Sequence, residues 1–379
     1  MEQSLKKYLL LALVISIPLI AVQIWLNRTY RQTLDSMAES DKTGPIVMAS
    51  SAAAKEQVPP PPSRFRVPSS SPAFGKPLDY SFAVSGDLKL PGSTYAKGGI
   101  LVDLDSRRVL WAKKPEQSLP IASMTKMMTL LVAIEQLDAS PERSFETPVQ
   151  VTKSATKIGG SQIWLDPRET LTLETLFKAV AIKSANDAAY LISEYFGGGD
   201  VASFVARMNE RAKELGFSGT RFVNAHGLTD SASGENSVST PEEMVLLGER
   251  LLEYPKLMEW FGTPMDHFTY PVSGKTIELA NHNKLVRPRY PGVDGIKTGY
   301  NAQSGFCLTV SCLRNGRRLM ACVMGFPAAK DLKTGRDPFA RKLLDWGYSR
   351  AAELDRSATA PRPTPTTPTS QSPTRNLRR

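Results

Sequence analysis

Residues 121–137 of this 379-residue chain, Ile-Ala-Ser-Met-Thr-Lys-Met-Met-Thr-Leu-Leu-Val-Ala-Ile-Glu-Gln-Leu, place a serine and a lysine at the start of a strongly apolar segment. Apolar side chains cover nearly every side of a helix drawn over this segment, which is typical of a helix buried in the centre of a domain. Ser123 and Lys126 are three residues apart and therefore share one helical face. Burial disfavours a charged amine, so we expect Lys126 to have a lowered pKa and to act as a base toward Ser123.

Two more short motifs follow in chain order, Ser184-Ala185-Asn186 and Lys297-Thr298-Gly299. The first lies between two helical patterns, and the second precedes a hairpin pattern, which predicts a place on or beside an edge strand. Glycine in that strand would let a substrate backbone approach, and lysine offers a cation to a carboxylate. The same patterns recur in settings that lack a buried helix or a strand, starting at Ser4, Lys42, Ser154 and Lys333. Local context therefore favours the copies at Ser123, Ser184 and Lys297.

The remaining patterns predict strands at both ends of the core and helices between them. Residues 99–104 with 108–112, and residues 305–313 with 318–326, form apolar or β-branched runs joined by turn residues, which predict two hairpins. Helical patterns cover residues 123–137, 171–182, 187–196, 201–215, 241–252 and 338–348. This order predicts an α/β fold in which one antiparallel sheet, built from both ends of the core, is covered by helices.

Composition divides the chain into four parts. Within residues 1–31, the uncharged apolar run at 8–26 follows two lysines and precedes no small-x-small cleavage site, so we expect a membrane anchor, with a cleaved signal as the alternative. Residues 32–79 are rich in Pro, Ser and Ala, which predicts an extended linker. Residues 80–350 form the core, and the Pro, Thr, Ser and Arg of residues 351–379 predict a disordered tail.

Charge and cysteine content argue against two classes of function. The net charge of +10 lies partly in the arginines of the tail, so we expect a solvated basic tail and no nucleic-acid partner. Cys307, Cys312 and Cys322 lack the Cys-x-x-Cys spacing of a zinc site, and their odd number argues against a disulfide framework. In the predicted second hairpin Cys322 lies opposite Thr309, which is poor geometry for a bond to Cys307. We expect three buried, unpaired cysteines.

The core, about residues 98–348, resembles the D-alanyl-D-alanine carboxypeptidases among the low-molecular-weight penicillin-binding proteins, the S11 serine peptidases. The resemblance rests on residues 121–128, 183–188, 224–228, 281–283 and 293–300, which match the family around as well as within the three motifs. It implies the serine β-lactamase/DD-peptidase fold, a five-stranded antiparallel sheet flanked by helices, plus a helical region.

The resemblance also implies how the catalytic residues would act. Ser123 would attack the carbonyl between the two terminal D-alanines of a peptidoglycan stem peptide, and Lys126 would take its proton. Ser184 would relay a proton to the leaving amine, and water would release the acyl-enzyme. No metal or other cofactor is implied.

Binding roles follow from the same resemblance. Asn186 would hydrogen-bond the peptide, and the strand motif of Lys297, Thr298 and Gly299 would hold its terminal carboxylate. Backbone N–H groups of Ser123 and of Tyr300, the residue after the motif, would hold the oxyanion. The implied partners are the stem peptide and β-lactam antibiotics, and the implied location is outside the cytoplasmic membrane, on the periplasmic side.

Four alternatives remain open from the sequence. A DD-endopeptidase acting on cross-links would use the same acylation step and differ in what the leaving side accommodates. A β-lactamase shares the fold, but residues 215–234 contain no glutamate to activate the deacylating water, so we expect slow release of penicillin. An inactive relative could only bind peptidoglycan. A Ser-His-Asp hydrolase would need His226, and the chain lacks a Gly-x-Ser-x-Gly elbow.

Overall fold

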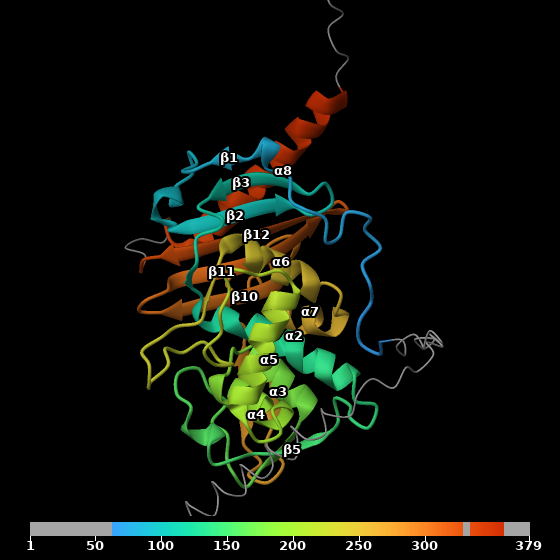
Figure 1. The fold of residues 1–379 in the computed structure, drawn as a ribbon, viewed down its shortest axis with the longest axis vertical. Coiled ribbons are helices and arrows are strands. Elements are labelled where there is room, and N and C mark those ends of the chain that lie inside the picture. The colour runs from blue at the N-terminus through green and yellow to red at the C-terminus, as the bar shows by residue number, and fades with distance from the viewer. Residues whose placement is uncertain (1–62, 329–333, 360–379) are drawn as a thin grey trace, which may run out of the picture. The chain divides into compact units, whose positions relative to one another are not determined.

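The computed structural model describes residues 63–328 and 334–359, which build one sheet with helices on both faces (Figure 1). The sheet has the strand order β1-β3-β2-β12-β11-β10. These strands are β1 (Val84–Ser85), β2 (Gly98–Asp103), β3 (Arg108–Lys113), β10 (Val293–Asn301), β11 (Gly305–Arg314) and β12 (Arg317–Phe326). Five of them form the expected antiparallel sheet. The sixth, β1, is two residues long and pairs in parallel with β3, so the expected count of five was one short.

Both predicted hairpins are present, as β2–β3 and β11–β12. Cys322 lies opposite Thr309 in the second hairpin, as expected from its turn. All three cysteines are buried and unpaired. They therefore act as small apolar side chains of the sheet.

The helices agree with the predicted patterns to within a few residues, except at the C-terminus. They are α2 (Lys126–Asp138), α3 (Leu173–Ala181), α4 (Asn186–Phe196), α5 (Val201–Glu214), α6 (Pro241–Leu251), α7 (Pro255–Phe261) and α8 (Arg336–Thr359). A 3₁₀ turn, η4 (Ala122–Thr125), precedes α2. Two elements were not predicted from the sequence, α7 and the small hairpin of β8 (Met265–Thr269) and β9 (Thr276–Ala280).

Alternation along the strands separates two apolar layers. Ile100 and Val102 of β2 pack on the face that α6 covers, in an apolar layer that continues into α2, α3 and α4, whereas Leu101 faces the other layer, which α8 covers. This period of two is what a sheet buried on both faces requires. α2 is apolar on nearly all sides because it lies inside the first layer, as its sequence predicted.

Residues 63–79, expected as the end of a free linker, instead pack against the core, and we name residues 63–66 the strap. The Phe65 ring lies 4.8 Å from the Phe145 ring, and Arg66 pairs with the buried carboxylate of Glu253 at 2.9 Å. Arg64 donates to the carbonyls of Leu137, Ser140 and Arg143, at and beyond the end of α2. These contacts hold the strap against the core although its composition is typical of a linker, because the end of a helix offers unpaired carbonyls that a guanidinium can satisfy.

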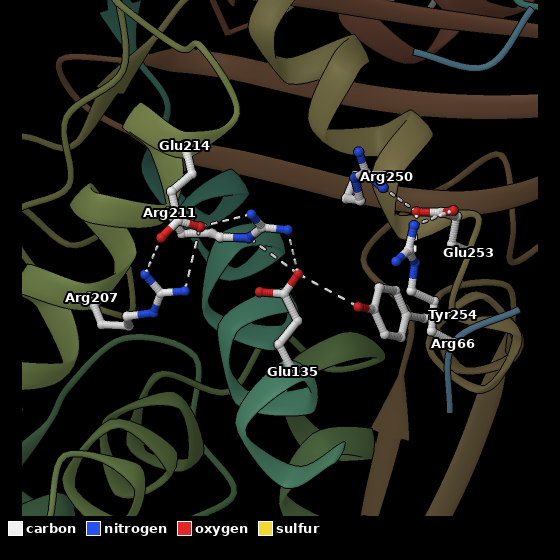
Figure 2. A network of polar contacts seen from close by, with 8 residues as sticks. All are labelled: Arg66, Glu135, Arg207, Arg211, Glu214, Arg250, Glu253 and Tyr254. Atoms are coloured by element: carbon white, nitrogen blue, oxygen red, sulfur yellow. Dashed lines mark hydrogen bonds and ion pairs between the residues drawn. The ribbon is translucent and has the colours of Figure 1, made fainter. Parts of the chain in front are cut away.

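Figure 2 shows how the strap joins a larger polar network. Glu253 accepts from Arg66 and from Arg250. On the neighbouring side, Glu135 of α2 accepts from Arg211 of α5 at 2.7 Å. The Tyr254 hydroxyl, which donates to Glu135 at 3.5 Å, joins the two halves, so the network connects the strap, α2, α5 and the end of α6.

The other corrected boundary lies in α8. The helix continues to Thr359 and so includes residues 351–359, the first nine residues of the segment that we expected to be a disordered tail. Leu354 packs against the second apolar layer, and Asp355 pairs with Arg108 at 2.8 Å. The extension was missed because residues 351–359, which contain no proline, were grouped with the proline-rich sequence that follows them. No helix in the described part of the chain is both long and apolar enough to cross a bilayer, and the anchor expected at residues 8–26 lies outside the described residues.

We predict that Glu253→Ala lowers the free energy of unfolding by about 2 kcal/mol, because two arginines lose a buried acceptor. Although burial opposes it, the hydrogen bond from Arg66 and the charge of Arg250 lower the pKa of Glu253. The carboxylate therefore contributes stability above its ordinary pKa and loses it as the pH falls. Chemical denaturation at several pH values should show the difference from wild type narrowing below about pH 4.

Glu259→Ala is the matched control, since Glu259 pairs with Lys256 on the surface and should matter by less than about 0.5 kcal/mol. Equal losses in the two variants would contradict the role given to the strap.

Candidate active site

The amine of Lys126 lies fully buried among three oxygen atoms. Its Nζ is 2.9 Å from Ser123 Oγ, 2.7 Å from Asn186 Oδ1 and 2.5 Å from the carbonyl oxygen of His226. The amide and carbonyl oxygens can only accept hydrogen bonds. A neutral amine has two protons for these acceptors and one lone pair, which is left to face the serine hydroxyl. The arrangement therefore fits a base poised to take the proton of Ser123.

Burial is the main cause that lowers the pKa of Lys126 well below its usual value, followed by the charge of Lys297. Asp187 opposes this shift. The sequence-based expectation of a desolvated, partly neutral lysine is thus supported by the surroundings of its side chain.

Two glycines allow the chain to close around η4, which carries Ser123. A Cβ on Gly227, whose φ is +82°, would overlap the Ala122 carbonyl. A Cβ on Gly299 would overlap the Ile121 carbonyl and approach the Met124 nitrogen to 3.3 Å. We expected Gly299 to admit the backbone of a substrate; in the structure it admits the turn that presents the serine.

The Ser184 motif lies between α3 and α4, as expected. Ser184 adopts a left-handed conformation with φ of +62° and makes no hydrogen bond within the described part of the chain. The amide of Asn186 is shared between Lys126 and the carbonyl of Gly159, to which its nitrogen donates at 2.7 Å. These two contacts show that Asn186 positions Lys126. Asn186 also lines the cavity, so its contact with the peptide stays a prediction.

The strand motif occupies β10, at the edge of the sheet, as predicted. Lys297 is 2% exposed, and its Nζ donates to the Thr298 carbonyl at 3.2 Å. Burial first, and the charge of Arg336 second, lower the pKa of Lys297 to about 7. Tyr300 is half exposed and stacks on Phe306 with ring centroids 4.2 Å apart.

One cavity of about 890 Å³ joins these elements. Its walls include six of the expected site residues, namely Ser123, Ser184, Asn186, Thr298, Gly299 and Tyr300. Lys126 and Lys297 lie behind the walls, so they act on the cavity through Ser123 and through their charges. All three motifs therefore meet at one cleft, as their order in the chain predicted.

Two contributions were not anticipated from the sequence. Arg336, at the start of α8, lines the cavity, donates to the Cys307 carbonyl at 2.9 Å and pairs with Asp337. No motif marks it, because it follows the last strand by ten residues of unremarkable sequence. His226 contributes its carbonyl to Lys126, while its Nδ1 accepts from the Leu228 N–H, so the imidazole is not placed as the base of a Ser-His-Asp site.

A family model described as D-alanyl-D-alanine carboxypeptidase, Peptidase S11, matches residues 87–328. The chain belongs to the peptidase S11 family. Among S11 relatives, D-alanyl-D-alanine carboxypeptidase DacF of Bacillus subtilis is 36% identical over 67% of this chain and 62% of its own length. DacC of Escherichia coli is 33% identical over 71% of this chain and 64% of its own length. The chain thus spans less than two thirds of the length of these curated relatives.

Solved structures place this S11 chain in the serine β-lactamase/DD-peptidase fold. Penicillin-binding protein D2 of Listeria monocytogenes, in its ampicillin-bound form, is 27% identical with a TM-score of 0.58, covering 69% of this chain and 99% of that chain. The D-alanyl-D-alanine carboxypeptidase of Mycobacterium tuberculosis is 27% identical with a TM-score of 0.61, covering 70% and 94%.

We predict that Asn186→Asp moves the pH dependence of serine acylation. A carboxylate beside Lys126 raises the pKa of the amine, so the neutral base appears only at higher pH, and the rising limb should shift upward by about 1 unit or more. The measurement is the rate of acylation by a fluorescent penicillin between acid and alkaline pH.

Asn315→Asp, at the exposed turn between β11 and β12, introduces the same charge away from Lys126 and should leave the limb in place. A slower rate with an unmoved limb in Asn186→Asp would show that Asn186 serves packing alone.

Proposed function

We propose that this protein is a serine D-alanyl-D-alanine carboxypeptidase that removes the terminal D-alanine of peptidoglycan stem peptides through an acyl-enzyme. The observation that supports this best is the buried amine of Lys126, whose Nζ lies 2.9 Å from Ser123 Oγ and within hydrogen-bond distance of two further acceptor oxygens. Family membership and the shared fold favour the same activity.

The proposed reaction begins with loss of the Ser123 proton to Lys126 as Oγ attacks the scissile carbonyl. The C–N bond then breaks, and the amine of the terminal residue leaves with a proton that Ser184, free of other hydrogen bonds on the cavity wall, can pass on. Water hydrolyses the resulting ester and restores the serine. The N–H groups of Ser123 and Tyr300 are proposed to hold the oxyanion.

The carboxylate of the leaving D-alanine needs cations on the same side of the cleft. Thr298 and Arg336 line the cavity, and Lys297 stands behind Thr298. A carboxylate would compensate the repulsion between Lys297 and Arg336 that lowers the pKa of the lysine. This explains why a carboxylate-ended peptide suits the site.

β-Lactams are proposed as covalent inhibitors, since their strained amide presents a carbonyl to the same serine. The ampicillin-bound state of the Listeria protein supports this for a chain of similar fold. Because residues 215–234 contain no glutamate, we propose slow deacylation, unlike a β-lactamase. A role in binding alone is disfavoured, because Lys126 lies beside Ser123 and the three motifs meet at one cavity.

For location, we propose that residues 8–26 anchor the chain in the cytoplasmic membrane with the catalytic domain on the outer, periplasmic side. The uncharged apolar run and the wall substrate support this. Membrane fractionation of the full chain against a chain starting at residue 32 tests it, and recovery of both in the soluble fraction would contradict it.

We predict that Ser123→Ala abolishes both D-alanine release from a pentapeptide and covalent labelling by fluorescent penicillin, because no other group supplies the nucleophile. Wild type should give a labelled adduct that persists on denaturing gels.

Ser154→Ala is the matched control, since Ser154 and Lys157 repeat the same spacing in a different 3₁₀ turn. Continued D-alanine release by Ser123→Ala would refute the assigned nucleophile, whereas rapid loss of the wild-type adduct would favour a β-lactamase.

A further inference from the structure

A tryptophan and two lysines beside the cleft form an exposed surface that the proposed reaction does not use, and we call it the indole platform: Trp164, Lys183 and Lys275. Trp164 is 57% exposed. The Nζ atoms of Lys183 and Lys275 lie 5.1 and 5.4 Å from the centroid of its ring. An ammonium group at this distance is attracted to an indole ring, so the three side chains form one unit although they come from separate segments.

Buried polar contacts hold Trp164 in its outward position. Its backbone has a φ of +56°, in the left-handed region that bulky residues rarely adopt. The buried carboxylate of Asp187 accepts from the backbone N–H groups of Ile163 and Leu165, on either side of the tryptophan. Both neighbours are buried, whereas the indole between them is exposed. The loop is therefore fixed in a form that presents this one side chain to a ligand.

The turn between β8 and β9, which carries the second lysine of the platform, is fixed to the same loop. The buried carboxylate of Glu169 accepts from the N–H groups of Val272 and Ser273 at 2.8 and 2.7 Å. The hydroxyl of Tyr270 donates to the Ile163 carbonyl at 3.0 Å. The platform is thus held in place before any ligand arrives, which lowers the entropic cost of binding one.

The two lysines of the platform are not neutralised by an acid. Neither forms an ion pair in the part of the chain that the structure describes, and the Nζ of Lys183 donates instead to the Glu278 carbonyl at 3.0 Å. Lys178 on α3, by contrast, pairs with Glu174 and with Asp266. The ammonium groups of the platform can therefore donate to acceptor oxygens of a ligand.

The platform borders the catalytic cleft. Ser161, which lines the cavity, precedes Trp164 by three residues, so their Cα atoms are at most about 11 Å apart. Lys183 directly precedes Ser184, another residue of the cavity wall. The charge of Lys183 also reaches His282 in that wall, where burial is the main cause that lowers the pKa to about 4 and the lysine contributes. A substrate larger than a single peptide can therefore contact the platform while its peptide occupies the cavity.

The composition of the platform favours a sugar ring over a lipid surface. A pyranose has a face of C–H groups that stacks on an aromatic ring, and its hydroxyl and N-acetyl oxygens accept hydrogen bonds from ammonium groups. Binding to a bilayer increases with the apolar area that is buried. Val272, 65% exposed in the neighbouring turn, adds little area to the indole, and the exposed Met265 lies at the opposite end of β8. One indole beside two cationic donors fits a sugar better.

We propose that the indole platform binds an N-acetylated sugar ring of the glycan strand to which stem peptides are attached, so that the protein prefers strand-bound peptides to free ones. This inference rests on the proposed function, because the stem peptide must occupy the adjoining cavity. No covalent step is added. The platform contributes binding energy for the attached peptide, and the chemistry at Ser123 is unchanged.

The test compares two substrates with one preparation of the full chain: a free pentapeptide, and un-cross-linked glycan strands that carry the same pentapeptide. D-alanine release is measured on both. For Trp164→Ala, we expect kcat/KM on the strands to fall by about fivefold, mainly through KM, because stacking on the ring is lost. The rate on the free pentapeptide and labelling by fluorescent penicillin should stay within about twofold, since the indole lies outside the cavity walls.

Three further variants isolate the sugar contact. Trp164→Phe keeps an aromatic ring and should recover most of the activity on the strands. Lys275→Gln removes one cationic donor and should lower that activity by about threefold. Leu313→Ala is the matched control, because it removes an exposed apolar side chain from β11, seven residues along the strand from Phe306 of the cavity wall, and should change neither substrate.

A direct binding measurement does not depend on catalysis. Calorimetric titration of the full chain with glycan strands freed of their peptides should show binding by wild type. The same titration with Trp164→Ala should show binding that is weaker by about fivefold.

The outcomes separate this inference from the proposed function. Equal losses on both substrates in Trp164→Ala would overturn the platform, because they would show that the residue only supports the loop beside Ser184. Unchanged rates on the strands would overturn it too, and quenching of Trp164 fluorescence by brominated anionic lipids would then assign the surface to a membrane. Failure of wild type on both substrates would overturn the proposed function, whereas calorimetric binding that depends on Trp164 would still support the platform.

Discussion

The active site depends on excluding water from one amine, that of Lys126. Lys126 is buried at the start of α2, the helix that lies inside the first apolar layer, and this burial is the main cause of its lowered pKa. Its hydrogen-bond geometry then directs the lone pair toward Ser123, because Asn186 and the His226 carbonyl take the two protons. The lowered pKa of Lys126 and the orientation of its amine toward Ser123 thus result from the same packing. A helix exposed to water would provide neither.

Several residues outside α2 maintain this packing. Gly227 and Gly299 allow two segments of the backbone to pack closely against η4. The carboxylate of Asp187 accepts hydrogen bonds from the backbone N–H groups of Ile163 and Leu165 and so holds the adjoining loop. Gly227 and Asp187 lie outside the cavity walls, whereas Gly299 also lines them. They explain why the family motifs extend beyond the reacting groups, into positions where shape alone is constrained.

The sequence predicted the parts of the fold that repeat a simple pattern. Two hairpins, the buried helix and the edge position of Lys297 followed from alternation, helical periodicity and the Asn315-Gly316 turn. Asn186 was predicted as a residue that binds substrate, and its contact with Lys126 depends on how distant helices pack. Arg336 was missed for the same reason, since only the tertiary fold brings α8 to the cleft. The strap and the end of α8 were misjudged because each adjoins a proline-rich stretch, and the few residues that pack show no pattern of their own.

The strap has a mechanical consequence. It attaches at the C-terminal end of α2, whereas Lys126 begins the same helix, so about 18 Å of rigid helix separates the two. Arg64 therefore makes its contacts about one length of α2 away from Lys126. A pull on the chain at Ser63 would act first on the hydrogen bonds of Arg64 and would reach Lys126 only through the whole helix.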